Sequence, residues 1–179
     1  MQSLGQKKTR NFSPGLPLAV LVWVVIVVSG MIHLEQYSHA AGEAGSAPHT
    51  LPSQSKLATS ADLPHLLLFV HPRCPCSQAS VGELEQLLCR FPDKLKAIVS
   101  FYAPAGADRN WVTTDLFRQA ERLPATTIFI DNDGKEADRF GIRTSGHALF
   151  YDIDDQLRFS GGITPSRGHY GASVGGDVI

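Results

Sequence analysis

The chain has 179 residues and a formal net charge of −1. This length suits one domain with additional segments, and the near-zero charge excludes a basic surface for nucleic acid. Three cysteines are too few for a disulfide-stapled scaffold.

The first predicted element is an apolar helix near the N-terminus. Residues 16–32 read LPLAVLVWVVIVVSGMI and contain no charged side chain. A run that is apolar on all faces is typical of a transmembrane anchor, which we place at residues 16–34 behind a cytoplasmic tail of residues 1–15. The tail carries three basic residues: Lys7, Lys8 and Arg10.

The charges on either side of this run set its orientation. Positive residues remain in the cytoplasm, and the other flank has no Lys or Arg before Lys56. We therefore expect a single-pass protein of the cell inner membrane whose C-terminal domain lies in the periplasm or another extracytoplasmic space. A signal peptide is the alternative, with Ser38-His39-Ala40 as a small-residue cleavage site, and it leads to the same export.

Residues 35–61 are rich in Ala, Gly, Ser, Pro and Thr and show no apolar periodicity. This composition predicts a flexible linker.

Residues 62–165 alternate between strand and helix patterns. The alternation predicts parallel strands with crossover helices, followed by an antiparallel pair, so the fold class is α/β with a mixed sheet. Residues 103–110 read as a loop, and the Gly-rich tail 166–179 reads as irregular. The expected elements are strands at 66–70, 95–102, 126–130, 148–151 and 156–159, and helices at 77–90, 114–123 and 135–140.

The sequence Cys74-Pro75-Cys76 falls between the first strand and the first long helix. The carboxyl end of a central strand is where open α/β sheets carry their chemistry. The free N–H groups and the dipole of a helix N-terminus stabilise a thiolate, and Arg73 adds a positive charge. We therefore expect reactive thiols here, whereas unreactive buried thiols are the alternative.

The two cysteines can bridge each other. Cα atoms two residues apart lie about 5.5–7 Å from each other, and disulfides span about 4.4–6.8 Å. Pro75 fixes one dihedral angle, so we expect a strained and oxidising bridge. Cys89 lies about 20 Å further along the predicted helix and reads as a small buried apolar residue near its end.

These blocks resemble the thioredoxin fold and its membrane-anchored, exported thiol-disulfide proteins of bacteria. LLLFV, HPRCPC and a helix resemble the strand, the W-C-x-x-C motif and the helix of that family, and FGIRTSGHALFYD resembles its cis-proline segment. With LRFSGGIT and SRGH, the blocks resemble the thioredoxin-like group labelled RedB. The resemblance implies a thioredoxin-like sandwich over residues 62–165, with Cys74 as the attacking thiol and Gly146 in the place of the cis-proline.

The chain also resembles, more distantly, the exported Sco copper proteins, which bind copper through two cysteines and a histidine. That resemblance implies Cys74, Cys76 and His147 as ligands, a set that suits copper. The alternative is that His147 is a polar residue at the start of a strand.

Three functions follow as hypotheses. The first is a membrane-tethered, extracytoplasmic thiol-disulfide oxidoreductase that acts on exported protein thiols or disulfides and needs no cofactor beyond a redox-active Cys74–Cys76 disulfide. Cys74 attacks, Cys76 resolves the mixed disulfide, Arg73 stabilises the thiolate and His147 shuttles a proton. The others are a copper-binding metallochaperone and a non-catalytic interaction module with a structural disulfide.

Overall fold

The computed structural model describes residues 15–40, 42, 45–58 and 63–179. The chain divides into two compact units, one ending at Ser38 and one running from His39 to Ile179. The expected basic tail with Lys7, Lys8 and Arg10 lies outside the described residues.

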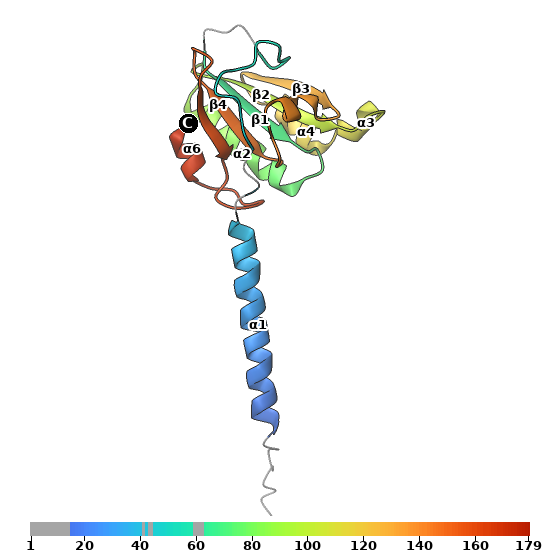
Figure 1. The fold of residues 1–179 in the computed structure, drawn as a ribbon, viewed down its shortest axis with the longest axis vertical. Helices are drawn as coiled ribbons and strands as arrows, with labels where there is room; N and C mark the ends of the chain where they lie inside the picture. Colours follow the sequence, from blue (N-terminus) through green and yellow to red (C-terminus); the bar gives the residue numbers. More distant parts are fainter. Residues whose placement is uncertain (1–14, 41, 43–44, 59–62) are drawn as a thin grey trace, which may run out of the picture. The chain divides into compact units, whose positions relative to one another are not determined.

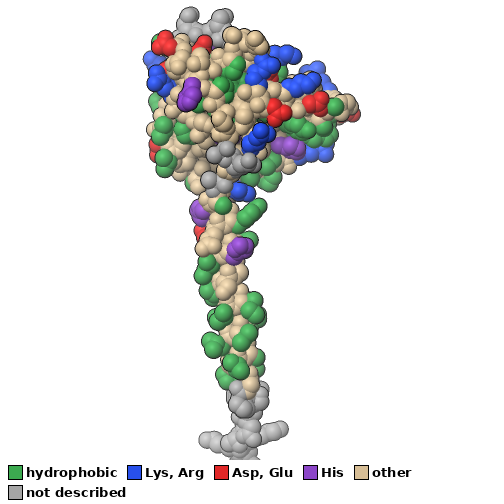
Figure 2. Space-filling view, viewed as in Figure 1, with side chains coloured by type: hydrophobic (Ala, Val, Ile, Leu, Met, Phe, Trp, Pro, Cys, Tyr) green, Lys and Arg blue, Asp and Glu red, His purple; other side chains and the backbone are tan. Residues whose placement is uncertain are grey.

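The first unit is the helix α1 (Gly15–His39), which has no buried residue. Hydrophobic side chains cover it along most of its length (Figure 2). At about 1.5 Å per residue the helix is about 38 Å long, more than a hydrocarbon core requires. It can therefore cross a membrane by length and composition, although a signal sequence near an N-terminus meets the same criterion.

The second unit is built on a five-stranded mixed sheet with the order β3-β2-β1-β4-β5 (Figure 1). β1, β2 and β3 are parallel, and β4 and β5 run antiparallel to their neighbours. β1 is buried along its whole length, which explains its unbroken apolar sequence. The bounds are β1 (His65–Val70), β2 (Lys96–Ala103), β3 (Thr126–Asn132), β4 (His147–Tyr151) and β5 (Leu157–Gly162).

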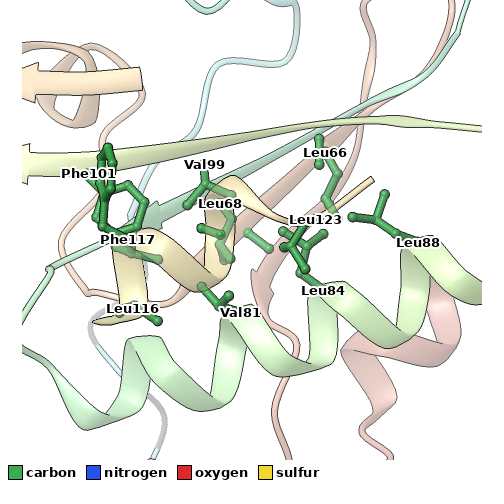
Figure 3. Close-up of a cluster of buried hydrophobic side chains, with 14 of the residues drawn as sticks. Leu66, Leu68, Val81, Leu84, Leu88, Val99, Phe101, Leu116, Phe117 and Leu123 are labelled. Carbon is green, nitrogen blue, oxygen red and sulfur yellow. The ribbon is translucent and has the colours of Figure 1, made fainter. Parts of the chain in front are cut away.

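One face of the sheet is covered by α2 (Pro75–Arg90) and α4 (Asp115–Glu121). Leucine and valine side chains of α2 at helical spacing pack on those of β1 and β2 (Figure 3). The rings of Phe101 and Phe117 close this core, with their centroids 5.1 Å apart. The side chains of this cluster include Leu66, Leu68, Val81, Leu84, Leu88 and Val99.

Part of the expected loop over residues 103–110 is instead the start of the short helix α3 (Arg109–Val112). Asp108 caps it, because its carboxylate accepts the N–H of Trp111 at 2.9 Å. An Asp cap followed by so short a helix leaves no apolar periodicity, so the pattern did not predict it.

The opposite face carries α5 (Lys135–Arg139) and residues 45–58, and the latter do not behave as the flexible linker that we expected. Leu51 and Leu57 are 6% and 1% exposed, and they join the core around Phe140. The hydroxyl of Ser55 donates to Glu136 at 2.5 Å. A composition typical of linkers therefore conceals two anchoring leucines that are too far apart to show a period.

The C-terminal residues also contain structure where an irregular tail was expected. α6 (Val174–Val178) follows Ser173, whose hydroxyl accepts the N–H of Gly176 at 3.1 Å. The N–H of Gly171 donates to the Glu83 carboxylate on α2 at 2.6 Å. The described domain is thus a thioredoxin-like sandwich of a mixed sheet between two helical layers, which confirms the predicted fold class.

Candidate functional site

The two cysteines lie where β1 ends and α2 begins. Cys74 is the N-cap of α2, and Pro75 occupies the first turn, where its missing N–H costs nothing. The backbone of Cys74 is held on both sides, because its N–H donates to His71 and its carbonyl accepts from Ser77, each at 3.1 Å. Both thiols are free and partly exposed.

The surroundings shift the pKa values of the two thiols in opposite directions. Burial acts to raise the pKa of Cys74, but the nearby N–H groups of Ser77 and Cys76 and the Cys76 thiol outweigh it and lower that pKa. Burial raises the pKa of Cys76, and the negative charge and hydrogen bond of Cys74 raise it further. The Cys74 side chain makes no capping hydrogen bond to the helix. The N–H groups therefore lower the pKa of Cys74 because they lie close to its sulfur. The surroundings therefore favour the thiolate form at Cys74 and the protonated thiol at Cys76.

Arg73 is exposed, and its guanidinium carbon lies 5.2 Å from the centroid of the Trp111 ring. This cation–π contact directs its charge to the aromatic ring, and the groups that lower the pKa of Cys74 are hydrogen-bond donors. The positive charge of Arg167 acts to lower the pKa of Cys76, but burial and the Cys74 thiolate outweigh it. Sequence analysis missed Arg167, because only the folded C-terminal segment brings it to the dithiol.

His71 connects the dithiol to an aromatic wall. Its ring stacks on Tyr102 with a centroid distance of 5.8 Å and meets Trp111 edge-on at 5.4 Å. Its backbone N–H donates to Ser145 at 2.7 Å and to Ser77 at 3.2 Å. The hydroxyls of Ser77 and Ser145 lie 2.5 Å apart and join the first turn of α2 to the loop before β4. Neither serine has a sequence signal that sets it apart.

Gly146 lies beside α2. Its N–H donates to Phe69 at 2.7 Å, and its φ is +87°, a value that favours glycine. A Cβ at this position would lie 2.6 Å from the Ser80 hydroxyl and 3.8 Å from the Cys76 carbonyl. No peptide bond among the described residues is cis.

His147 is buried on the sheet face opposite α2, because it pairs with Phe69 and shares that residue's side of the sheet. Its Nε2 lies 2.9 Å from the hydroxyl of Ser160, and burial lowers its pKa. Across residues 15–40, 42, 45–58 and 63–179, no group of three His, Cys, Asp or Glu side chains is placed to hold a metal ion. The structure thus does not assemble the ligand set Cys74, Cys76 and His147.

Cys89, which we expected to be buried, is exposed on α2. The helix turns its apolar stripe of Leu84, Leu87 and Leu88 to the core, and position 89 falls outside that stripe.

No protein-family model matches the chain, and no curated protein matches it. Solved structures with a similar fold include the following three. An uncharacterized conserved protein from Geobacillus kaustophilus is 16% identical, with 78% of this chain and 77% of that chain covered and a TM-score of 0.52. A hypothetical protein from Sinorhizobium meliloti is 14% identical, with 78% and 81% covered and a TM-score of 0.52.

A thioredoxin-like protein from Aeropyrum pernix is 17% identical, with 76% of this chain and 89% of that chain covered and a TM-score of 0.47. At these identities the likeness concerns the fold alone.

Proposed function

We propose that the protein is a membrane-tethered, extracytoplasmic thiol-disulfide oxidoreductase that exchanges electrons through Cys74 and Cys76. The observation that carries the proposal is that the pKa values of the two thiols at the start of α2 are shifted in opposite directions. Disulfide exchange requires a thiolate that attacks and a second thiol that holds its proton until it resolves the mixed disulfide. The lowered pKa of Cys74 and the raised pKa of Cys76 support these two roles.

In the first step the Cys74 thiolate attacks one sulfur of a substrate disulfide. The substrate S–S bond breaks, a mixed disulfide forms with Cys74, and the other substrate sulfur leaves as a thiolate. The N–H groups of Ser77 and Cys76 stabilise the attacking charge before the step.

In the second step Cys76 gives up its proton and its sulfur attacks the Cys74 sulfur. The bond between Cys74 and the substrate breaks, and the second substrate sulfur leaves as a thiolate that takes up the proton. Once Cys74 is no longer an anion, the charge that raised the pKa of Cys76 is gone, while Arg167 still lowers that pKa. The products are a Cys74–Cys76 disulfide and a substrate reduced by two electrons. The reverse sequence oxidises a substrate dithiol.

The N-terminal helix supports the cellular part of the proposal. α1 is long and apolar enough to span a membrane, and the dithiol belongs to the unit that follows it in the chain. A substrate disulfide is most abundant outside the cytoplasm, where thiols are oxidised.

The test compares Cys76→Ser with Cys74→Ser in the full-length chain, using a small aromatic disulfide that releases a coloured thiolate. Cys76→Ser retains the attacking thiol and a hydroxyl donor, so we expect rapid release and a stable mixed disulfide. Its rate should stay high below the pKa of an ordinary thiol, about 8.5, since the folded protein lowers the pKa of Cys74. Cys74→Ser should react slowly.

Equal rates for the two variants would contradict the proposed roles. If both variants keep the cellular function of the parent, the protein is an interaction module. Stoichiometric copper that is lost from His147→Ala would favour a metallochaperone.

A further inference from the structure

A cavity of about 270 Å³ lies on the α5 side of the sheet, and two of its lining residues, His71 and Ser145, are hydrogen-bonded to the start of α2. It lies at the carboxyl ends of β1, β2 and β3, the position where α/β sheets bind ligands. The residues that matter for its chemistry are Phe69, His71, Ser100, Tyr102, Ile142 and Ser145.

The cavity shares two residues with the site of exchange. The carbonyl of His71 accepts the N–H of Cys74, and Ser145 bonds both Ser77 of α2 and the N–H of His71. A polypeptide joined to Cys74 through its cysteine would thus have neighbouring residues within reach of this opening.

The surface of the walls is mostly apolar and aromatic. Thr144 and Arg143 also line the cavity, and the Arg143 guanidinium is paired with Asp138 at 3.6 Å. Phe69 and Ile142 supply apolar surface, and the stacked rings of His71 and Tyr102 supply a flat side. Such a surface favours an aromatic ring over a charged or small polar group.

Ser100 supplies a buried polar group that the described fold leaves without a hydrogen bond. It is 2% exposed, and its hydroxyl has no hydrogen-bond partner among the described residues. Asp131, which also lines the cavity, is engaged, because its carboxylate accepts the N–H groups of Glu136 and Ala137 at 3.0 and 2.8 Å. Buried hydroxyls are normally paired, so the Ser100 hydroxyl points to a ligand that brings a polar atom into the cavity.

The size of the cavity limits what it can hold. Pockets for drug-sized ligands measure roughly 300–1,000 Å³, so about 270 Å³ suits a single large side chain. Tyr and Trp combine an aromatic body with one hydrogen-bonding group near the tip, which matches mostly apolar walls and the buried Ser100 hydroxyl.

We propose that this cavity is a specificity pocket for one side chain of the substrate polypeptide, a tyrosine or tryptophan close in sequence to the cysteine that Cys74 attacks. The pocket rests on the proposed exchange function and names the substrate class for it: exported polypeptides with an aromatic residue beside the reactive cysteine.

The test uses full-length Cys76→Ser protein in detergent. Short peptides carry one cysteine, activated as a disulfide with 5-thio-2-nitrobenzoate, and differ only in a Tyr, Phe or Gly placed one or two residues from it. Attack by Cys74 releases the yellow thiolate and forms the mixed disulfide with the peptide. Each rate is divided by the rate of the same variant with the small disulfide alone.

We expect the Tyr peptide to react about tenfold or more faster than the Gly peptide, from burial of the ring. We expect it to exceed the Phe peptide by about two- to tenfold, from one hydrogen bond. Ser100→Ala should bring the ratio of the Tyr rate to the Phe rate close to one. It should leave the ratio of the Phe rate to the Gly rate unchanged. Ala137→Leu places a larger side chain in the cavity, so the rates of both aromatic peptides should fall toward the rate of the Gly peptide. Ala137→Ser is the matched control.

Equal normalised rates for Tyr, Phe and Gly would overturn the pocket while leaving the exchange function intact. The same holds if Ala137→Leu does not change an aromatic preference. Absence of thiolate release from the small disulfide would instead contradict the exchange function itself, so the two failures are distinguishable. Unfolding midpoints of the variants show whether each one is folded.

Discussion

At the scale of single residues, chemically identical side chains differ because of their neighbours. Cys74 and Cys76 are separated by one proline, yet N–H donors lower the pKa of Cys74. Burial raises the pKa of Cys76, and the negative charge of Cys74 raises it further. A helix N-terminus favours a negative charge only where the donors converge, which here is at Cys74.

His147 leads to a prediction about acid stability. Burial lowers its pKa in the folded state, whereas an unfolded histidine titrates near about 6.5. The unfolded chain therefore binds the proton first, so stability is full above about pH 6.5 and falls as the pH drops below it, by up to about 1.4 kcal/mol per pH unit. His147→Gln should flatten this fall in urea unfolding measured at pH 7.5, 6.5 and 5.5.

The glutamine amide retains a group that can bond Ser160. Part of the acid slope should remain in the variant, because burial also lowers the pKa of His65. Identical slopes in parent and variant would show that protonation of His147 does not oppose folding.

At the scale of elements, residues 45–58 extend the domain. The N–H of Leu51 donates to Asp155 at 2.9 Å, and the Tyr151 hydroxyl donates to Pro48 at 2.9 Å. These contacts add a strap over the α5 side of the sheet, and Leu57 is its most buried side chain.

Leu57→Ala should lower the free energy of unfolding by about 2–5 kcal/mol, because it removes a fully buried leucine and leaves a cavity. Lys56→Ala, at the exposed neighbouring position, should change it by less than about 0.5 kcal/mol. Chemical denaturation of the full-length chain measures both. A Leu57→Ala variant as stable as Lys56→Ala would mean that the strap does not belong to the cooperative unit.

At the scale of the whole molecule, α1 is long and apolar enough to cross a membrane, and a signal sequence meets the same criterion. An uncleaved anchor should leave the full-length chain in the membrane fraction, resistant to carbonate and released by detergent. A protease added outside the cytoplasm should then degrade the residues from His39 onward. A soluble product whose N-terminus lies near Ala40 would instead identify the segment as a signal peptide.

The sequence by itself determined the α/β fold class, because a fully buried parallel strand and amphipathic helices have local apolar patterns. The run Leu66–Val70 and the stripe Val81, Leu84 and Leu88 show those patterns. It also predicted the apolar N-terminal helix, now seen as Gly15–His39, and the position of Cys74 and Cys76 between a strand and a helix.

Only the tertiary structure decided what surrounds those thiols. Arg167 acts on Cys76, Ser145 reaches Ser77, and His147 turns to the opposite face of the sheet. The tertiary structure also decided that Leu51 and Leu57 are buried and that Cys89 is exposed. The reason is physical: local patterns report which residues share a face of one element, whereas contacts between distant segments arise only when the chain packs.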